Sequence, residues 1–180
     1  MGTEGNEGHG DLRFRGMEKR HVGPERRLDG ADDSVHERTI LVGASITDAF
    51  DFLADGRHDP LWLPWISRSH LEEFGGGVGA AYAQVVTDSA FGQPDFAYRV
   101  VHYRRPVMLG IEVVSLVLHP TATYRLTPLE PTSTAITLTG AVPNSRGAEP
   151  DQGAAQHWVG LLLEGLPSLK ACLEGWPGLS

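Results

Sequence analysis

The sequence predicts an α+β fold: a curved antiparallel sheet of about seven strands wrapped on a long C-terminal helix, with two short helices after the first strand. Three observations lead to this prediction. One extended segment and two short helical segments come first, between residues 35 and 63. Six short segments then follow between Gly- and Pro-containing turns, at the close spacing typical of hairpins. At the end, apolar residues recur every three or four positions, as in an amphipathic helix.

Residues 35–42 have the composition of a strand, and the chain turns after them at Gly43. Ser45 is a good N-cap for a helix, and Asp48, three residues later, makes a short-armed version of a capping box. The apolar face of this first helix follows the spacing i, i+3, i+4, i+7, at Ile46, Ala49, Phe50 and Leu53. A second short helix is expected over residues 57–63, because Pro64 stops it.

The six further strands are expected at residues 69–74, 78–87, 96–103, 107–118, 121–128 and 134–142. The long helix is expected from about residue 152 to residue 174, and Pro167 predicts a kink or break near Glu164. Residues 1–33 are rich in Gly, Glu and Arg with few large apolar residues, so we expect a disordered N-terminal tail. Residues 34–178 are then one domain, long enough to bury a core of its own.

Composition excludes several classes of function. The formal net charge is −8, with 13 Arg but only Lys19 and Lys170 as lysines, so a basic surface for nucleic acid is not expected. No apolar run is long enough to span a bilayer, and the first 30 residues lack the apolar core of a signal peptide. Cys172 is the single cysteine, which excludes an internal disulfide. These observations predict a protein of the reducing cytoplasm, and the bias toward Arg is typical of GC-rich bacterial genomes.

The sequence offers little for metal, phosphate or nucleophilic chemistry. The glycine-rich residues 74–79 precede a strand and have no nearby lysine, so they indicate a hairpin turn and not a phosphate loop. Asp55, His58 and Asp59 could together hold a divalent metal, but Gly56 and Pro60 place them in a turn where polar residues are ordinary. No Gly-x-Ser-x-Gly elbow is present. We therefore predict no metal site and no cofactor.

Three stretches resemble a known family. Residues 40–55 look like its first strand, turn and first helix, and Trp62-Leu-Pro-Trp65 resembles the aromatic segment after its second short helix. The segments 100–108, 123–129 and 134–138 resemble its central strands. In their order and spacing, residues 35–175 resemble the START/Bet v 1-like helix-grip superfamily, and specifically its polyketide cyclase/dehydrase-like (SRPBCC) branch. The resemblance implies an internal cavity for a sterol, lipid, polyketide or aromatic metabolite.

An aromatic set is the candidate lining of such a cavity, although each member also suits an ordinary core. In residues 96–103 the charged Asp95 and Arg99 share one parity, so the other parity should face inward. That parity includes His102, a polar group that either is simply hydrogen-bonded or transfers a proton to a ligand. The candidate ligand-binding residues are Trp62, Trp65, Tyr82, Phe96, Tyr98, His102, Trp158 and Leu162, with His102 as the candidate catalytic residue.

Three functions remain open at this point. The first is a binding protein for a small apolar or aromatic molecule, polyketide- or lipid-like. The second is an aromatase/cyclase that positions a poly-β-keto chain and assists aldol closure with acid/base groups such as His102, Tyr82 or Tyr98. The third is a protein-interaction module without a small-molecule ligand, which an exposed apolar patch would indicate. The sequence does not give the oligomeric state.

Overall fold

The computed structural model describes residues 34–73, 75–87, 95–116, 119–143 and 149–175, and the predicted N-terminal tail lies outside the described residues. The elements in chain order are β1 (Ser34–Val42), α1 (Ile46–Ala54), η1 (Gly56–His58), α2 (Asp59–Trp62), β2 (Ile66–Glu73), β3 (Ala81–Val86), β4 (Asp95–Arg104), β5 (Met108–Val113), β6 (Thr121–Glu130), β7 (Ser133–Val142) and α3 (Glu149–Gly175). The predicted fold class is confirmed, including the two short helical segments after the first strand.

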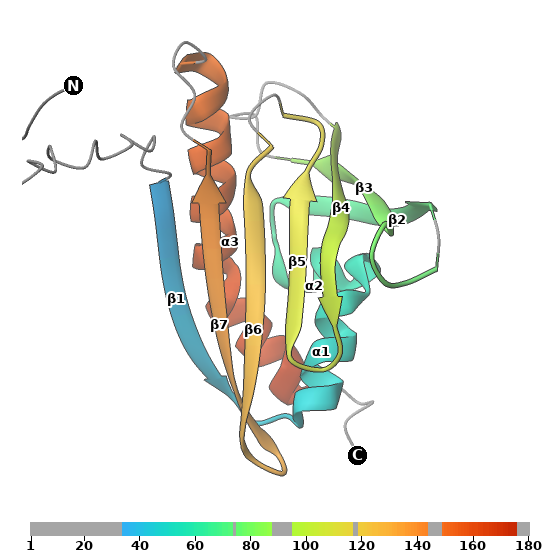
Figure 1. Cartoon of the computed structure of the whole chain (residues 1–180), viewed down its shortest axis with the longest axis vertical. Helices are drawn as coiled ribbons and strands as arrows, with labels where there is room; N and C mark the ends of the chain where they lie inside the picture. Colours follow the sequence, from blue (N-terminus) through green and yellow to red (C-terminus); the bar gives the residue numbers. More distant parts are fainter. Residues whose placement is uncertain (1–33, 74, 88–94, 117–118, 144–148, 176–180) are drawn as a thin grey trace, which may run out of the picture. The chain divides into compact units, whose positions relative to one another are not determined.

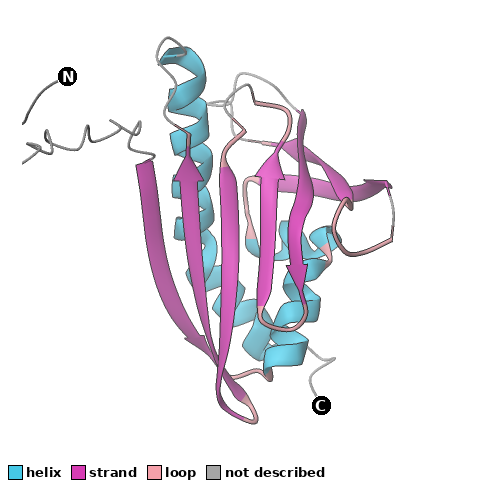
Figure 2. Ribbon diagram, in the orientation of Figure 1, coloured by secondary structure: helices cyan, strands magenta, loops and turns pink. Residues whose placement is uncertain are grey.

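The sheet is antiparallel throughout, in the order β1-β7-β6-β5-β4-β3-β2. Its strands β2 to β7 form a meander, and β1 joins it beside β7, so the first and last strands of the chain are neighbours. In Figure 1, β2 and β3 turn away from the direction of β6 and β7, so the sheet curves at that edge. The helices α1, α2 and α3 lie on the same side of the sheet (Figure 2).

Local signals explain how α1 begins. Ser45 is its N-cap, and the Ser45 side-chain oxygen accepts a hydrogen bond from the backbone N–H of Asp48 at 3.2 Å. The predicted N-cap at Ser45 is thus confirmed, and the Ser45 hydroxyl also donates to the Asp48 carboxylate, which ties the two side chains together. Ala49, Phe50 and Leu53 of the predicted apolar face are buried.

Helix α3 supplies most of the second layer. Its buried face contains the residues whose spacing predicts the helix, Ala155, Trp158, Leu162, Leu166, Leu169 and Leu173. At β7 the helix comes so close that a Cβ added to Gly140 would lie 2.4 Å from Cγ1 of Val159. A larger residue at 140 would therefore push the helix off the sheet.

Of the kink or break expected near Glu164, the break is absent, since α3 runs without interruption through Pro167. A proline inside a helix leaves the carbonyl four residues earlier without its usual N–H partner. Here that carbonyl belongs to Leu163, and it accepts a hydrogen bond from Nη1 of Arg38 at 3.1 Å. Strand β1 thus supplies the donor that Pro167 lacks.

Trp158 is 2% exposed, and we expect its truncation to be among the most destabilising changes in the core. Trp158→Ala should lower the free energy of unfolding by about 3–5 kcal/mol, because a large side chain is lost from a packed interior. Urea unfolding measures this, with Leu129→Ala as the control, since Leu129 is 53% exposed and should change stability by less than ~0.5 kcal/mol. Equal midpoints for the two variants would contradict the packing described.

Candidate functional site

The interior between α3 and the sheet is almost filled. A cavity of about 10 Å³ remains there, close to the smallest space that holds one water molecule. Its lining consists of Asp59, Trp62, Leu63, Trp65, Gln84, Tyr98, Ile111, Tyr124, Trp158 and Leu162. The internal cavity that the family resemblance implies is therefore closed in this structure, and its lining is aromatic and aliphatic apart from Asp59 and Gln84.

Asp59 is the polar centre of this lining. Its Oδ2 atom accepts a hydrogen bond from the Tyr98 hydroxyl at 2.8 Å and another from Nε2 of Gln84 at 2.7 Å. The three residues come from α2, β4 and β3, so the contacts join the short helix to two strands of the sheet. All three side chains are buried.

Burial raises the pKa of Asp59 to about 7, because desolvation disfavours the charged carboxylate. Hydrogen bonds from Tyr98, Trp62 and Gln84 act in the opposite direction and favour the ionised form, while the nearby Asp55 charge raises the pKa further. Burial and the Asp59 charge also raise the pKa of Tyr98, which keeps its proton near neutral pH. Asp59 can therefore accept or donate a proton near neutrality, with Tyr98 as its fixed hydrogen-bond donor.

Gly56 allows this arrangement. It lies where α1 passes into η1, and a Cβ at this position would lie 2.1 Å from the Tyr98 hydroxyl and 2.7 Å from Cγ of Tyr82. Only a glycine lets the backbone pass this close to both rings. The two tyrosines lie opposite one another on β3 and β4, and their rings stack with centroids 5.4 Å apart.

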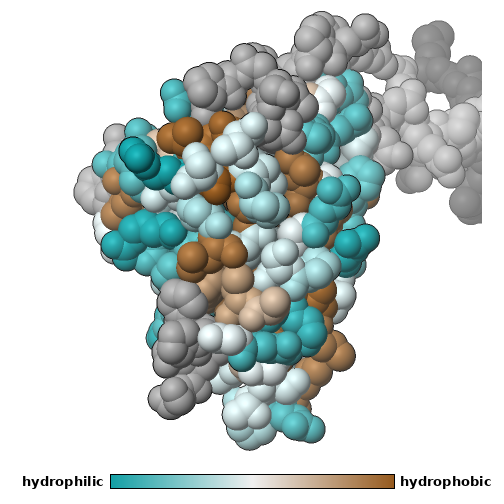
Figure 3. Space-filling view, turned by 180° about the vertical axis from the view of Figure 1, so that it is seen from behind, coloured by the Kyte–Doolittle hydropathy of each residue, from teal (hydrophilic) through white to brown (hydrophobic). Residues whose placement is uncertain are grey.

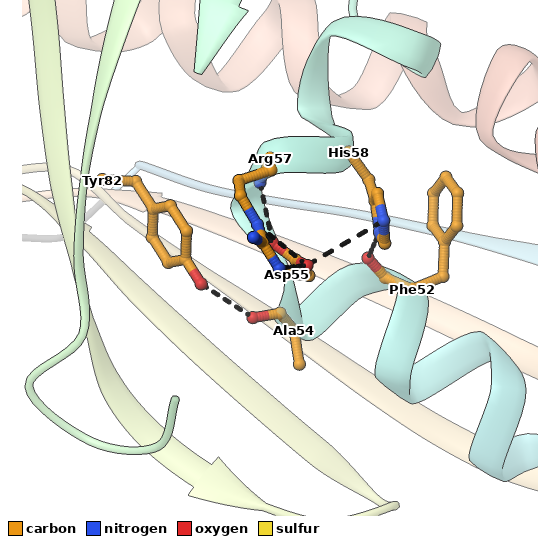
Figure 4. A network of polar contacts seen from close by, with 6 residues as sticks. All are labelled: Phe52, Ala54, Asp55, Arg57, His58 and Tyr82. Atoms are coloured by element: carbon orange, nitrogen blue, oxygen red, sulfur yellow. Dashed lines mark hydrogen bonds and ion pairs between the residues drawn. The ribbon is translucent and has the colours of Figure 1, made fainter. Parts of the chain in front are cut away.

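An open groove lies on the other side of Tyr82. It has a volume of about 430 Å³ and is lined by Asp51, Ala54, Asp55, Arg57, Leu71, Gly75, Gly76, Tyr82 and Tyr103. Tyr82 lines the groove and stacks on Tyr98, which lines the inner cavity, so the stacked pair of rings lies between the groove and the centre at Asp59. The Tyr82 hydroxyl donates to the Ala54 carbonyl at 3.3 Å, a long hydrogen bond (Figure 4).

The charged side chains at the rim of the groove form ion pairs with one another. The Arg57 guanidinium binds both carboxylate oxygens of Asp55, and the hydrogen bond lowers the pKa of Asp55 (Figure 4). Arg105 binds both oxygens of Asp51 at 2.7 Å, which lowers the pKa of Asp51 in the same way. His58 turns toward α1, where its Nδ1 lies 2.9 Å from the Phe52 carbonyl (Figure 4).

The predicted site residues separate into groups. All the aromatic candidates and Leu162 are buried. Those that line the inner cavity together are Trp62, Trp65, Tyr98, Trp158 and Leu162. Tyr82 lines the outer groove, and Phe96 lies opposite Gln84 in the strand pairing without lining either space.

The expected inward orientation of His102 is wrong. Phe96, Tyr98 and Val100 alternate inward as predicted, but the register between β4 and β5 shifts between Val100 and His102. This β-bulge reverses the alternation, so Tyr103 packs on Phe50 while His102 is exposed and lies over Gly110 of β5. His102 is therefore not part of the inner site.

Neither Asp59 nor Gln84 is predicted from the sequence as a residue of the ligand site. Gln84 shares the parity of Tyr82 and Val86 in β3, so strict alternation already places it inside. Asp59 has no comparable signal, because an acid before a proline in a turn is ordinary. Of the three residues that could together hold a metal, Asp55 and His58 lie near each other, with Nε2 of His58 3.9 Å from Oδ2 of Asp55. Asp59 points into the core instead, where it accepts a hydrogen bond from Tyr98.

The buried Asp59 should make stability depend on pH. The folded pKa of about 7 exceeds the ordinary value of 3.8, so the folded state keeps a proton that the unfolded chain releases between these values. The free energy of unfolding should fall by roughly 4 kcal/mol as the pH rises through this window, and level off above it. Asp59→Asn should remove this fall, which urea unfolding at several pH values measures.

Asp51→Asn is the matched control. The pKa of Asp51 is lowered, so its loss should remove a small contribution of the opposite sign, reduced by solvent because the pair with Arg105 is half-exposed. If the Asp59→Asn curve runs parallel to that of the unmodified protein, then Asp59 is not a buried titrating acid.

Several solved structures of other proteins have the same fold as this chain. No curated protein sequence matches the chain. Among solved structures, the Zhui aromatase/cyclase from Streptomyces sp. R1128 is 17% identical with a TM-score of 0.60, over 81% of this chain and 98% of that one. A START superfamily protein from Mycobacterium smegmatis is 16% identical with a TM-score of 0.56, over 77% of this chain and 98% of the other. The di-domain aromatase/cyclase StfQ of steffimycin biosynthesis is 15% identical with a TM-score of 0.60, over 81% of this chain and 52% of StfQ.

The sequence itself carries the assignment to a family. Residues 35–174 match the family described as polyketide cyclase / dehydrase and lipid transport, which covers every described element except the first residue of β1 and the last of α3. In the described part of the chain, no helix is long and apolar enough to cross a membrane. The chain therefore belongs to the polyketide cyclase/dehydrase and lipid transport family.

Proposed function

We propose that the protein binds a small apolar or aromatic molecule, polyketide- or lipid-like, which enters from the outer groove and reaches Asp59. The observation that carries this proposal is the buried carboxyl group of Asp59 in an aromatic interior, held by Tyr98 and Gln84. Small-molecule sites are typically apolar with a few polar groups that orient the ligand. The groove, at about 430 Å³, falls within the usual size range of such sites.

The inner cavity must enlarge for the ligand to reach Asp59. Tyr82 is the first side chain that must move, because its ring stands between the groove and Tyr98. Its hydroxyl makes a long hydrogen bond to the Ala54 carbonyl. When the ring turns outward, a hydrogen bond to water replaces this one at little cost in free energy. The ligand then replaces the ring as the partner that stacks on Tyr98.

A naphthalene-sized probe tests this route. We expect 2-naphthol to shift the indole N–H resonances of the buried Trp62, Trp65 and Trp158 in NMR spectra. Tyr82→Ala should strengthen binding several-fold, because the ligand no longer has to displace the ring from Tyr98, as isothermal titration calorimetry measures. Tyr103→Ala is the control, because Tyr103 lines the same groove but packs on Phe50 and not on Tyr98. If no indole shifts in either the unmodified protein or Tyr82→Ala, the interior is not a ligand site.

A second candidate function, a catalytically active aromatase/cyclase, is favoured by the pKa of about 7 at Asp59. Aldol closure removes a proton from one carbon of a poly-β-keto chain and delivers one to the carbonyl oxygen that is attacked. An ionised Asp59 would be the base and the Tyr98 hydroxyl the donor to that oxygen, since general acid/base groups work best with a pKa near the working pH. The Zhui and StfQ structures share the fold and are described as aromatase/cyclases.

For this second candidate, Asp59→Asn and Tyr98→Phe should each lower turnover of a poly-β-keto thioester by about 10²-fold while the affinity survives. The rate should rise with pH up to about 7 and then level off, because the base acts only when ionised. His102→Ala is the matched control and should leave turnover unchanged, since His102 is exposed. Unchanged turnover in Asp59→Asn would exclude the acid/base role and leave the binding function standing.

Nothing specific favours the interaction module without a ligand. On the helix-bearing side, hydrophobic residues are interspersed with hydrophilic ones (Figure 3). The large apolar side chains that are exposed in the described part of the chain are spread over several strands, loops and the short helix α2, at Val35, Leu41, Leu61, Leu71, Val78, Val107, Val114 and Leu129. Scattered exposure of this kind is normal for a globular protein.

A further inference from the structure

The inner cavity has an unusual balance of charge and aromatic surface. Five of its ten lining residues are aromatic, namely Trp62, Trp65, Tyr98, Tyr124 and Trp158. The one ionisable carboxyl group is that of Asp59, and none of the described lining residues is Lys, Arg or His. The Asp59 carboxyl group therefore faces an aromatic cavity whose described lining carries no positive charge.

The partners of Asp59 carry no positive charge. The hydrogen-bond donors are the Tyr98 hydroxyl, the Gln84 amide and the Trp62 side chain, all of which are neutral. The charged neighbour that acts on Asp59 is Asp55, which is itself acidic. A buried carboxylate without a cation is costly, so either a proton or a positively charged ligand must neutralise it.

The other groups that face Asp59 do not supply that charge. Tyr82 on β3, Tyr98 on β4 and Tyr124 on β6 have pKa values raised by burial and stay neutral. Toward α1, Arg57 is bound by the Asp55 carboxylate and His58 by the Phe52 carbonyl. The groove through which a ligand would enter has its arginines paired with Asp51 and Asp55, so it does not repel a cation.

We propose that the ligand is a protonated aromatic amine whose ammonium group lies against Asp59 and among the surrounding aromatic rings. This inference rests on the proposed function, because it needs the same entry past Tyr82. Aromatic faces attract cations, most strongly where water is excluded, and the carboxylate supplies the opposite charge. On binding, the proton of Asp59 leaves to solvent and the ammonium takes its place.

A pair of probes of equal shape tests the proposal: 2-naphthylmethylamine, a cation, and 2-naphthylmethanol, which is neutral. Isothermal titration calorimetry should show the amine binding about tenfold or more tightly at about pH 8. This preference should fall by up to about tenfold per pH unit below the pKa of Asp59, as protonation removes the carboxylate. In two buffers of different ionisation heat, the amine should release up to one proton at about pH 6, and the alcohol none.

Two variants locate the effect. Asp59→Asn should bind both probes equally, whereas Glu112→Gln, which removes a carboxylate paired with Arg99 and lining neither the groove nor the cavity, should keep the preference for the amine. If Asp59→Asn does not fold, the proton release by the unmodified protein still decides the matter. The proposal is overturned, with the proposed function intact, if the alcohol binds as tightly as the amine, or if the preference is lost in Glu112→Gln and kept in Asp59→Asn. If neither probe binds, this proposal and the proposed function fail together.

Discussion

The burial of the Asp59 carboxyl group is the constraint on which the rest of the interior depends. A carboxyl group away from water needs hydrogen-bond donors in fixed places, and Tyr98 and Gln84 provide them from adjacent strands. The two bonds hold α2 against the sheet, which brings Trp62 into the core beside Trp158. The chain reaches this position only because Gly56 passes close to the tyrosine rings. The polar centre and the packing of the short helices are thus one arrangement.

The long helix depends on a second contact between distant parts of the chain. Pro167 removes a backbone donor from the middle of α3, and Arg38 on β1 satisfies the carbonyl of Leu163 instead. On the same strand, the Leu41 carbonyl accepts a hydrogen bond from Nζ of Lys170 at 2.7 Å. Strand β1 is an edge strand, so these two side chains tie an otherwise open edge to the helix.

Local patterns in the sequence predict most of the fold and part of the site. Ser45 and Asp48 mark the start of α1, and the three-to-four-residue spacing from Ala155 to Leu173 marks the buried face of α3. Alternation in β4 correctly predicts that Tyr98 points inward, and it fails two residues after Val100. That failure comes from a β-bulge, which depends on how β4 pairs with β5 and leaves no mark within β4 itself. Asp59 escapes prediction for a similar reason, since its burial depends on strands about 25 and 39 residues further along the chain.

Among the described residues, the Asp59 carboxyl group has no cationic hydrogen-bond partner, and it lies at the centre of the proposed ligand site. The most direct measurement is the ¹³C chemical shift of the Asp59 carboxyl carbon, followed by NMR as the pH is changed, with and without the naphthalene probes. This carbon should titrate near pH 7 in the free protein, and its resonance should move when a probe binds. A titration near the ordinary value of 3.8, with no response to any probe, would contradict both expectations.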